Sequence, residues 1–123
     1  MTSLADRLRA EGGLIADVVR DPEAPSDLPL ALEAIREGYD LHHGAGRVVR
    51  TTDPDLALLA GDRQYAHRLA ELAAAGDLDG VRIMAEVIAA SAGARAAGDP
   101  AGAEAAWEHG VCAITQRPPG GEQ

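Results

Sequence analysis

The sequence predicts an all-α protein, a compact bundle of about five helices. Apolar residues make up 46% of the 123 residues, yet phenylalanine is absent and aromatic residues account for only 2%. The core must therefore consist of Leu, Ile, Val and Ala, whose small side chains let helices approach closely. Glycine and proline interrupt the chain at helix-length intervals, and apolar residues recur between them at three- and four-residue spacing. These observations favour helices over a sheet.

The first helix is expected from Ser3, its N-cap residue, to about Arg20. Gly12 and Gly13 lie in its middle and weaken it by roughly 1 kcal/mol each relative to alanine. Two prolines within residues 21–25 then prevent the helix from continuing.

The second helix is expected to begin at a cap formed by Ser26 or Asp27. It should run to about His43 and end at Gly44. The segment 47–52 that follows is a short connector rich in β-branched residues, and we expect it to be irregular.

The remaining three helices have clearer boundaries. Asp53 and Pro54 begin the third helix as N-cap and first helical residue, because proline lacks only a donor that would be unpaired there anyway. A Gly-Asp pair ends one helix and caps the next at residues 76–77 and again at residues 98–99.

One helical domain is expected over residues 1–115. It should be followed by a disordered tail over residues 116–123, which contain two prolines and two glycines.

Charge excludes several classes of partner. The formal net charge is −9, and every basic residue other than histidine is arginine. Such a chain has no basic face for nucleic acid and is repelled by anionic membranes. No apolar run is long enough to span a membrane, and the N-terminus lacks the pattern of a signal peptide, so a cytoplasmic protein is expected. The single cysteine, Cys112, allows no disulfide within the chain and should be buried as a small apolar residue.

Two segments resemble trans-polyprenyl diphosphate synthases. Residues 33–44 read E-A-I-R-E-G-Y-D-L-H-H-G and resemble the family's helix E-L-I-H-T-x-S-L-I-H-D-D. Residues 58–66 read L-L-A-G-D-R-Q-Y-A and resemble the next helix, L-A-G-D-x-L-x-A. The likeness covers about residues 33–75 and implies an isoprenoid-synthase-like helix pair at the core of the bundle.

The same resemblance implies that catalysis has been lost. In the ungapped register the two metal-binding aspartates of the family fall on His43 and Gly44, and a shift by one places them on Gly44 and Ala45. Magnesium prefers carboxylate, water and phosphate oxygens and gains little from imidazole. A truncated, degenerate segment that is not an enzyme and needs no cofactor is therefore expected.

A hydrophobic slot between the two helices holds the growing prenyl chain in that family. The resemblance implies that an isoprenoid or quinone tail could occupy the same place here, while the alternative is that these residues pack on one another as ordinary core. The residues concerned are Leu32, Ile35, Tyr39, Leu58, Leu59 and Tyr65.

Histidines and carboxylates give a weaker candidate site for Zn²⁺ or Fe²⁺. Asp40 and His43 share one helix face, and His67 and Glu71 share a face of the next helix, so the two pairs could converge. The favoured alternative is that His42 and His43 interact with the carbonyl end of their own helix, which leaves no metal site.

Charged residues on the same helices have simpler interpretations. Gly61 should permit close helix approach, and Asp62 should pair with Arg36, Arg47 or Arg50. A solvated helix face is expected to carry Glu33, Arg36, Glu37 and Asp40.

Protein association is the function that these features favour. The chain is expected to be a non-catalytic helical module, either a homo-oligomer or an accessory subunit of a larger assembly. Trp107 either anchors its own helix or serves as an interface residue. The alternative function is a carrier for an isoprenoid or quinone tail in the slot described above.

Overall fold

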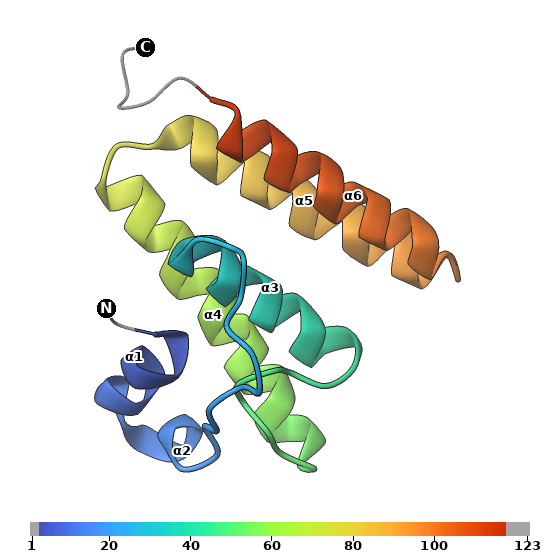
Figure 1. Ribbon diagram of the computed structural model, residues 1–123. Coiled ribbons are helices and arrows are strands. Elements are labelled where there is room, and N and C mark those ends of the chain that lie inside the picture. Colours follow the sequence, from blue (N-terminus) through green and yellow to red (C-terminus); the bar gives the residue numbers. More distant parts are fainter. Residues whose placement is uncertain (1–2, 118–123) are drawn as a thin grey trace. The chain divides into compact units, whose positions relative to one another are not determined.

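The computed structural model describes residues 3–117, and this part of the chain is helical with no strand beyond one isolated bridge (Figure 1). The all-α prediction is therefore confirmed. The helices are α1 (Leu4–Glu11), α2 (Gly13–Ala16), α3 (Leu30–His43), α4 (Pro54–Ala74), α5 (Leu78–Ala96) and α6 (Pro100–Thr115).

Contacts between residues divide the chain into two compact units, Met1–Arg68 and Leu69–Gln123. Helix α4 begins in the first unit and ends in the second. The expectation of one domain over residues 1–115 stays a prediction. Of the expected disordered tail, residues 118–123 lie outside the described residues, whereas Arg117 makes defined contacts with α5 and α6.

The expected first helix is two helices. Ser3 caps α1 as predicted, because its hydroxyl accepts a hydrogen bond from Asp6 N at 3.1 Å. The prediction of a continuous helix to Arg20 was wrong. Gly12 and Gly13 adopt φ values of 75° and 79°, a left-handed region that ends α1 at Glu11.

Helix α3 begins later than predicted. Neither Ser26 nor Asp27 caps it; its N-cap is Pro29, with φ −55° and ψ 154°. The Ser26 hydroxyl instead accepts from Leu28 N at 3.1 Å in a local turn. The physical reason is that a residue before proline is kept out of helical geometry, so Leu28 cannot enter the helix.

The connector between α3 and α4 is more regular than expected. Val19 and Val49 form an antiparallel bridge. The N–H of Arg20 donates to the carbonyl of Val48 at 2.8 Å, and the N–H of Arg50 donates to the carbonyl of Val18 at 2.9 Å. The β-branched residues of the connector suit this extended pairing.

The core of the first unit collects apolar side chains from α1, α2, α3, the connector and the first half of α4. All are at most 8% exposed: Leu4, Ala5, Leu8, Ile15, Val19, Ala34, Leu41, Val48, Val49 and Ala60. Distant segments thus meet in this unit.

The second unit is built on a hairpin in which α5 and α6 run side by side (Figure 1). Its predicted boundaries are confirmed. Asp77 and Asp99 each accept a hydrogen bond at 2.9 Å from the backbone N–H three residues on, and the preceding glycines adopt φ values of 78° and 76°. None of the described helices combines the length and apolar character needed to cross a bilayer.

Candidate functional site

Helices α3 and α4 cross at two glycines, as predicted for Gly61. A Cβ on Gly38 would lie 2.9 Å from the Gly61 carbonyl oxygen, and a Cβ on Gly61 would lie 3.1 Å from the Gly38 carbonyl oxygen. The Tyr65 ring and the His42 ring are also within contact distance of these two positions. Side chains therefore occupy the space between the helices at this crossing.

The residues predicted to line a hydrophobic slot are divided between core and surface. Leu32, Ile35 and Tyr39 on α3 are at most 4% exposed. On α4, Leu58 is 54% exposed and Leu59 is 55% exposed, because the buried face of this helix is formed by Ala60, Gly61, Gln64 and Arg68. Nothing in these contacts favours the isoprenoid carrier, which stays a prediction.

A histidine replaces the expected arginine as the partner of Asp62. His42 Nε2 lies 3.0 Å from Asp62 Oδ1, and the His42 ring meets the Tyr65 ring edge-on at 5.0 Å. Burial raises the pKa of Tyr65 above its usual range, and the nearby Tyr39 and Asp40 act in the same direction. The prediction that Asp62 pairs with an arginine was wrong. His42 lies one helix turn beyond Gly38, and its ring lies against Gly61 at the helix crossing, next to Asp62.

The four weak metal candidates have other neighbours. Asp40 forms an ion pair with Arg36 at 3.0 Å, and the His43 ring packs at a tilt against the Tyr39 ring, with their centroids 4.9 Å apart. His67 Nδ1 lies 3.7 Å from a carboxylate oxygen of Glu11. Glu71 lies in the second unit, one turn further along α4. Within residues 3–117 no three His, Cys, Asp or Glu side chains form a group that could hold a metal ion.

The prediction that Glu37 lies on a solvated helix face was wrong. It is 2% exposed, not solvated. Its carboxylate accepts hydrogen bonds from three backbone N–H groups of the connector: Arg47 at 2.9 Å, Val48 at 3.0 Å and Val49 at 2.8 Å. A side chain at Gly46 would collide with this carboxylate, so the loop can close over it only with glycine there. Glu37 thus fixes the connector to α3.

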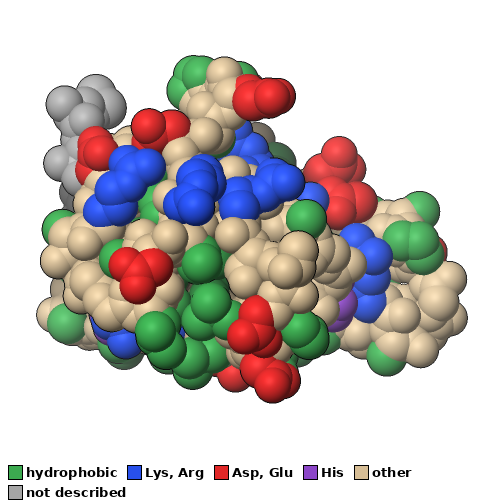
Figure 2. Space-filling model, turned by 90° about the horizontal axis from the view of Figure 1, so that it is seen from below, with side chains coloured by type: hydrophobic (Ala, Val, Ile, Leu, Met, Phe, Trp, Pro, Cys, Tyr) green, Lys and Arg blue, Asp and Glu red, His purple; other side chains and the backbone are tan. Residues whose placement is uncertain are grey.

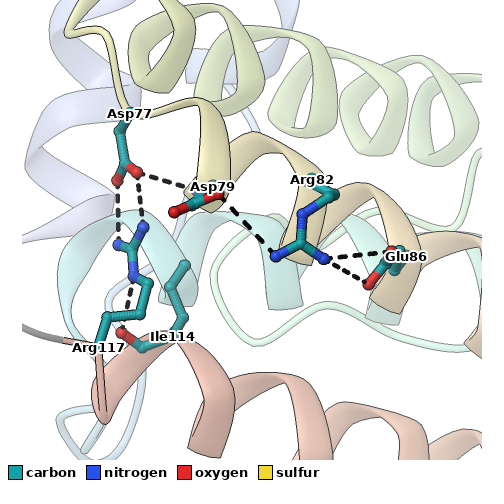
Figure 3. A network of polar contacts seen from close by, with 7 residues as sticks. Asp77, Asp79, Arg82, Glu86, Ile114 and Arg117 are labelled. Carbon is teal, nitrogen blue, oxygen red and sulfur yellow. Dashed lines mark hydrogen bonds and ion pairs between the residues drawn. The ribbon is translucent and has the colours of Figure 1, made fainter. Parts of the chain in front are cut away.

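A polar contact holds the ends of the hairpin in the second unit together (Figure 3). The guanidinium of Arg117, just beyond α6, forms a bidentate pair with Asp77, the cap of α5, with the Nη2 to Oδ2 distance at 3.0 Å. Arg117 Nε also donates to the carbonyl of Ile114 at 3.2 Å. The pKa of Asp77 is lowered, most by the hydrogen bond from Arg117 and next by the hydrogen bond from the Gly80 N–H.

Helix α5 carries two apolar faces. One is buried and consists of Gly80, Ile83, Met84, Val87 and Ser91. On another side Arg82 lies between Asp79 and Glu86, with its nearest oxygens at 4.0 Å and 3.4 Å, and forms a charged row (Figure 3).

The second apolar face of α5, the α5 stripe, remains at least partly accessible. Its members recur at three- and four-residue spacing, which places them along one side of a helix. Leu78 is 69% exposed, Ala85, Ala92 and Ala96 are exposed, and the other two members are half-buried. The α5 stripe consists of Leu78, Val81, Ala85, Ile88, Ala92 and Ala96.

On α6, one of the two alternatives for Trp107 is supported and the expectation for Cys112 was wrong. Trp107 is 2% exposed, so it anchors its own helix and is not available as an interface residue. Cys112 is exposed rather than buried. Both follow from the buried face of α6, which contains Ala103, Trp107 and Gly110 and leaves Cys112 on the other side.

Comparisons with known proteins identified no relative of this chain. No protein-family model, no curated protein and no solved structure matches this chain significantly.

Proposed function

We propose that this chain is a non-catalytic helical module that acts through protein association, with self-association along α5 as its simplest form. The observation that carries the proposal is the α5 stripe, an apolar face on a helix whose opposite contacts are already satisfied. A helix buries one apolar face by packing within its own fold. A second apolar face that stays exposed indicates contact with another protein surface.

The composition of the α5 stripe suits a second helix. Alanine side chains at Ala85, Ala92 and Ala96 are short, so two helices can approach to the lower end of the usual 8–10 Å range. Leu78 at the start of the stripe supplies a larger apolar side chain for the same contact. The charged row Asp79–Arg82–Glu86 lies beside the stripe and would form a polar rim.

The non-catalytic part of the proposal rests on the sequence. His43 and Gly44 stand where the resemblance to polyprenyl synthases would place metal-binding aspartates. An imidazole and a hydrogen atom are poor substitutes for two carboxylates at a magnesium site.

Light scattering after size exclusion tests the association. The unchanged chain should have a mass above that of the monomer. Ala92→Glu places a carboxylate in the stripe and should raise the dissociation constant at least about tenfold, because burying an unpaired charge is costly. Ala90→Glu is the matched control: it makes the same change at an exposed position of α5 outside the stripe and should leave the mass unchanged. A strictly monomeric parent chain would contradict the proposal.

A further inference from the structure

The first unit contains a basic hollow that the sequence does not reveal. It has a volume of about 800 Å³ and is lined by the segment 20–24 together with Arg47 and Arg50 from the connector. Arg20, Arg47 and Arg50 bring three guanidinium groups to it, in a chain whose net charge is −9. Figure 2 shows that basic side chains gather on the face it draws, with acidic side chains around them.

Each of the three guanidinium groups is oriented by neutral partners of the backbone. A guanidinium has five N–H donors, so a carbonyl that takes one nitrogen leaves others available for an anion. The carbonyl acceptors are those of Val19 for Arg20 at 2.8 Å, Ala24 for Arg47, and Gly46 for Arg50 at 3.4 Å.

The acidic side chains nearby offset this charge only in part. Asp21 lines the hollow, but its carboxylate is taken by Arg9 at 2.9 Å. Glu33 lies 3.6 Å from Arg47. Glu23 is the remaining acid of the lining. Because charges beyond about 8 Å are screened at physiological ionic strength, a ligand in the hollow would respond mainly to these local groups and less to the overall negative charge.

The backbone beneath the hollow is held in place by a bridge and by hydrogen bonds. Arg20 and Arg50 directly follow the bridged pair Val19 and Val49, and the connector is fixed to α3 by the carboxylate of Glu37. Side chains that are already positioned lose less conformational entropy when a ligand binds.

We propose that this hollow binds an acidic segment of a partner protein, with Asp or Glu carboxylates paired to Arg20, Arg47 and Arg50. Arginine suits carboxylates because its planar fork can form two parallel hydrogen bonds to each. The size of the hollow fits several residues of extended chain better than a single ion. The inference rests on the proposed role in protein association, but it uses a different surface, in the first unit.

Fluorescence anisotropy with the full chain tests the binding. The probe is a fluorescein-labelled hexaglutamate peptide, and a hexaglutamine peptide of the same length is the uncharged control. Hexaglutamate should bind at low ionic strength and more weakly at physiological ionic strength, and hexaglutamine should not bind. Arg50→Gln should weaken binding at least about tenfold, since it removes charge-assisted hydrogen bonds. Arg82→Gln, the same charge change on the exposed side of α5, should change it less than about twofold.

Three results would overturn the inference: no binding of hexaglutamate up to millimolar concentration, equal weakening in both arginine variants, or displacement of the peptide by inorganic phosphate at matched ionic strength. The last would indicate a site for small anions. Backbone amide spectra of Arg50→Gln check that the variant folds, and Arg20→Gln repeats the test at a second exposed position. Light scattering separates the two proposals, because Arg50→Gln should leave any self-association along α5 unchanged.

Discussion

The two units of this chain are specified in different ways. In the second unit the signals are local: a Gly-Asp pair ends one helix and begins the next, and each aspartate bonds to an N–H three residues away. In the first unit the decisive contacts join distant residues, such as Glu37 with the connector and Gly38 with Gly61. The comparison teaches that helix boundaries can be local properties while the placement of helices is not.

The largest expected difference between the units comes from Glu37→Gln. The replacement keeps one carbonyl oxygen, which can still accept from the buried N–H groups of Val48 and Val49. It turns an NH₂ group toward the part-buried N–H of Arg47, and an NH₂ group cannot accept a hydrogen bond. One unsatisfied donor at 1–3 kcal/mol, together with two hydrogen bonds that lose their charge assistance, predicts a loss of roughly 3 kcal/mol in the free energy of unfolding. Hydrogen exchange should show faster exchange at the amides of residues 47–49 and little change in α5 and α6.

Glu86→Gln is the matched control for this prediction. Glu86 contacts Arg82 only at the surface of α5, where its side chain is 67% exposed. Such surface pairs contribute about 0–1 kcal/mol, so the stability of the variant should be nearly unchanged. Equal stability of both variants would show that the connector does not depend on Glu37.

The sequence could predict the second unit closely because its signals are adjacent residues. Asp77, Asp99 and the glycines before them were sufficient to place both ends of the hairpin loop. Close approach at Gly61 was also predictable, since a glycine in mid-helix costs helix propensity and is tolerated where a neighbouring backbone needs the space. In the first unit the break at Gly12 and Gly13 and the late start of α3 were missed, and so was the burial of Glu37. Its partners are backbone N–H groups ten to twelve residues away, and backbone groups leave no mark in a sequence.

The candidate sites were less predictable than the fold. The hydrophobic slot required both leucines of the pair 58–59 to face α3, but successive residues on a helix point about 100° apart, and both lie at the surface. The basic hollow requires Arg20 and Arg50 to lie close together on either side of the bridged pair Val19 and Val49. No periodic pattern in the sequence predicts this bridge. The α5 stripe, by contrast, follows the three- and four-residue spacing of its apolar residues, which is visible in the sequence, although the exposure of this face is not.

Two glycine-to-alanine substitutions, one in each unit, should change the free energy of unfolding by an intermediate amount. Gly38→Ala would place a methyl group 2.9 Å from the Gly61 carbonyl oxygen, which as backbone cannot move away easily. Such overpacking costs about 1–3 kcal/mol. Gly93→Ala on α5 has nothing within 4 Å of the new methyl group and should stabilise by up to about 1 kcal/mol through helix propensity. Thermal unfolding of both variants should therefore shift in opposite directions; a shift in the same direction would contradict the close crossing of α3 and α4.

The smallest expected effect concerns the polar contact that closes the hairpin of the second unit. The pKa of Asp77 is lowered, first by the hydrogen bond from Arg117 and then by that from the Gly80 N–H. A lowered pKa means that the stabilisation is present above the ordinary pKa of an aspartate and is lost as the pH falls through the lowered value. Asp77→Ala removes the cap and the pair and should cost about 1 kcal/mol at neutral pH. Hydrogen exchange at the first amides of α5 measures this loss, which should shrink in acid as the parent chain protonates Asp77. Arg117→Gln keeps the cap and should lose only part of the stabilisation that Asp77→Ala loses. An equal loss in both variants would place the whole effect in the contact between Asp77 and Arg117 and none in the cap.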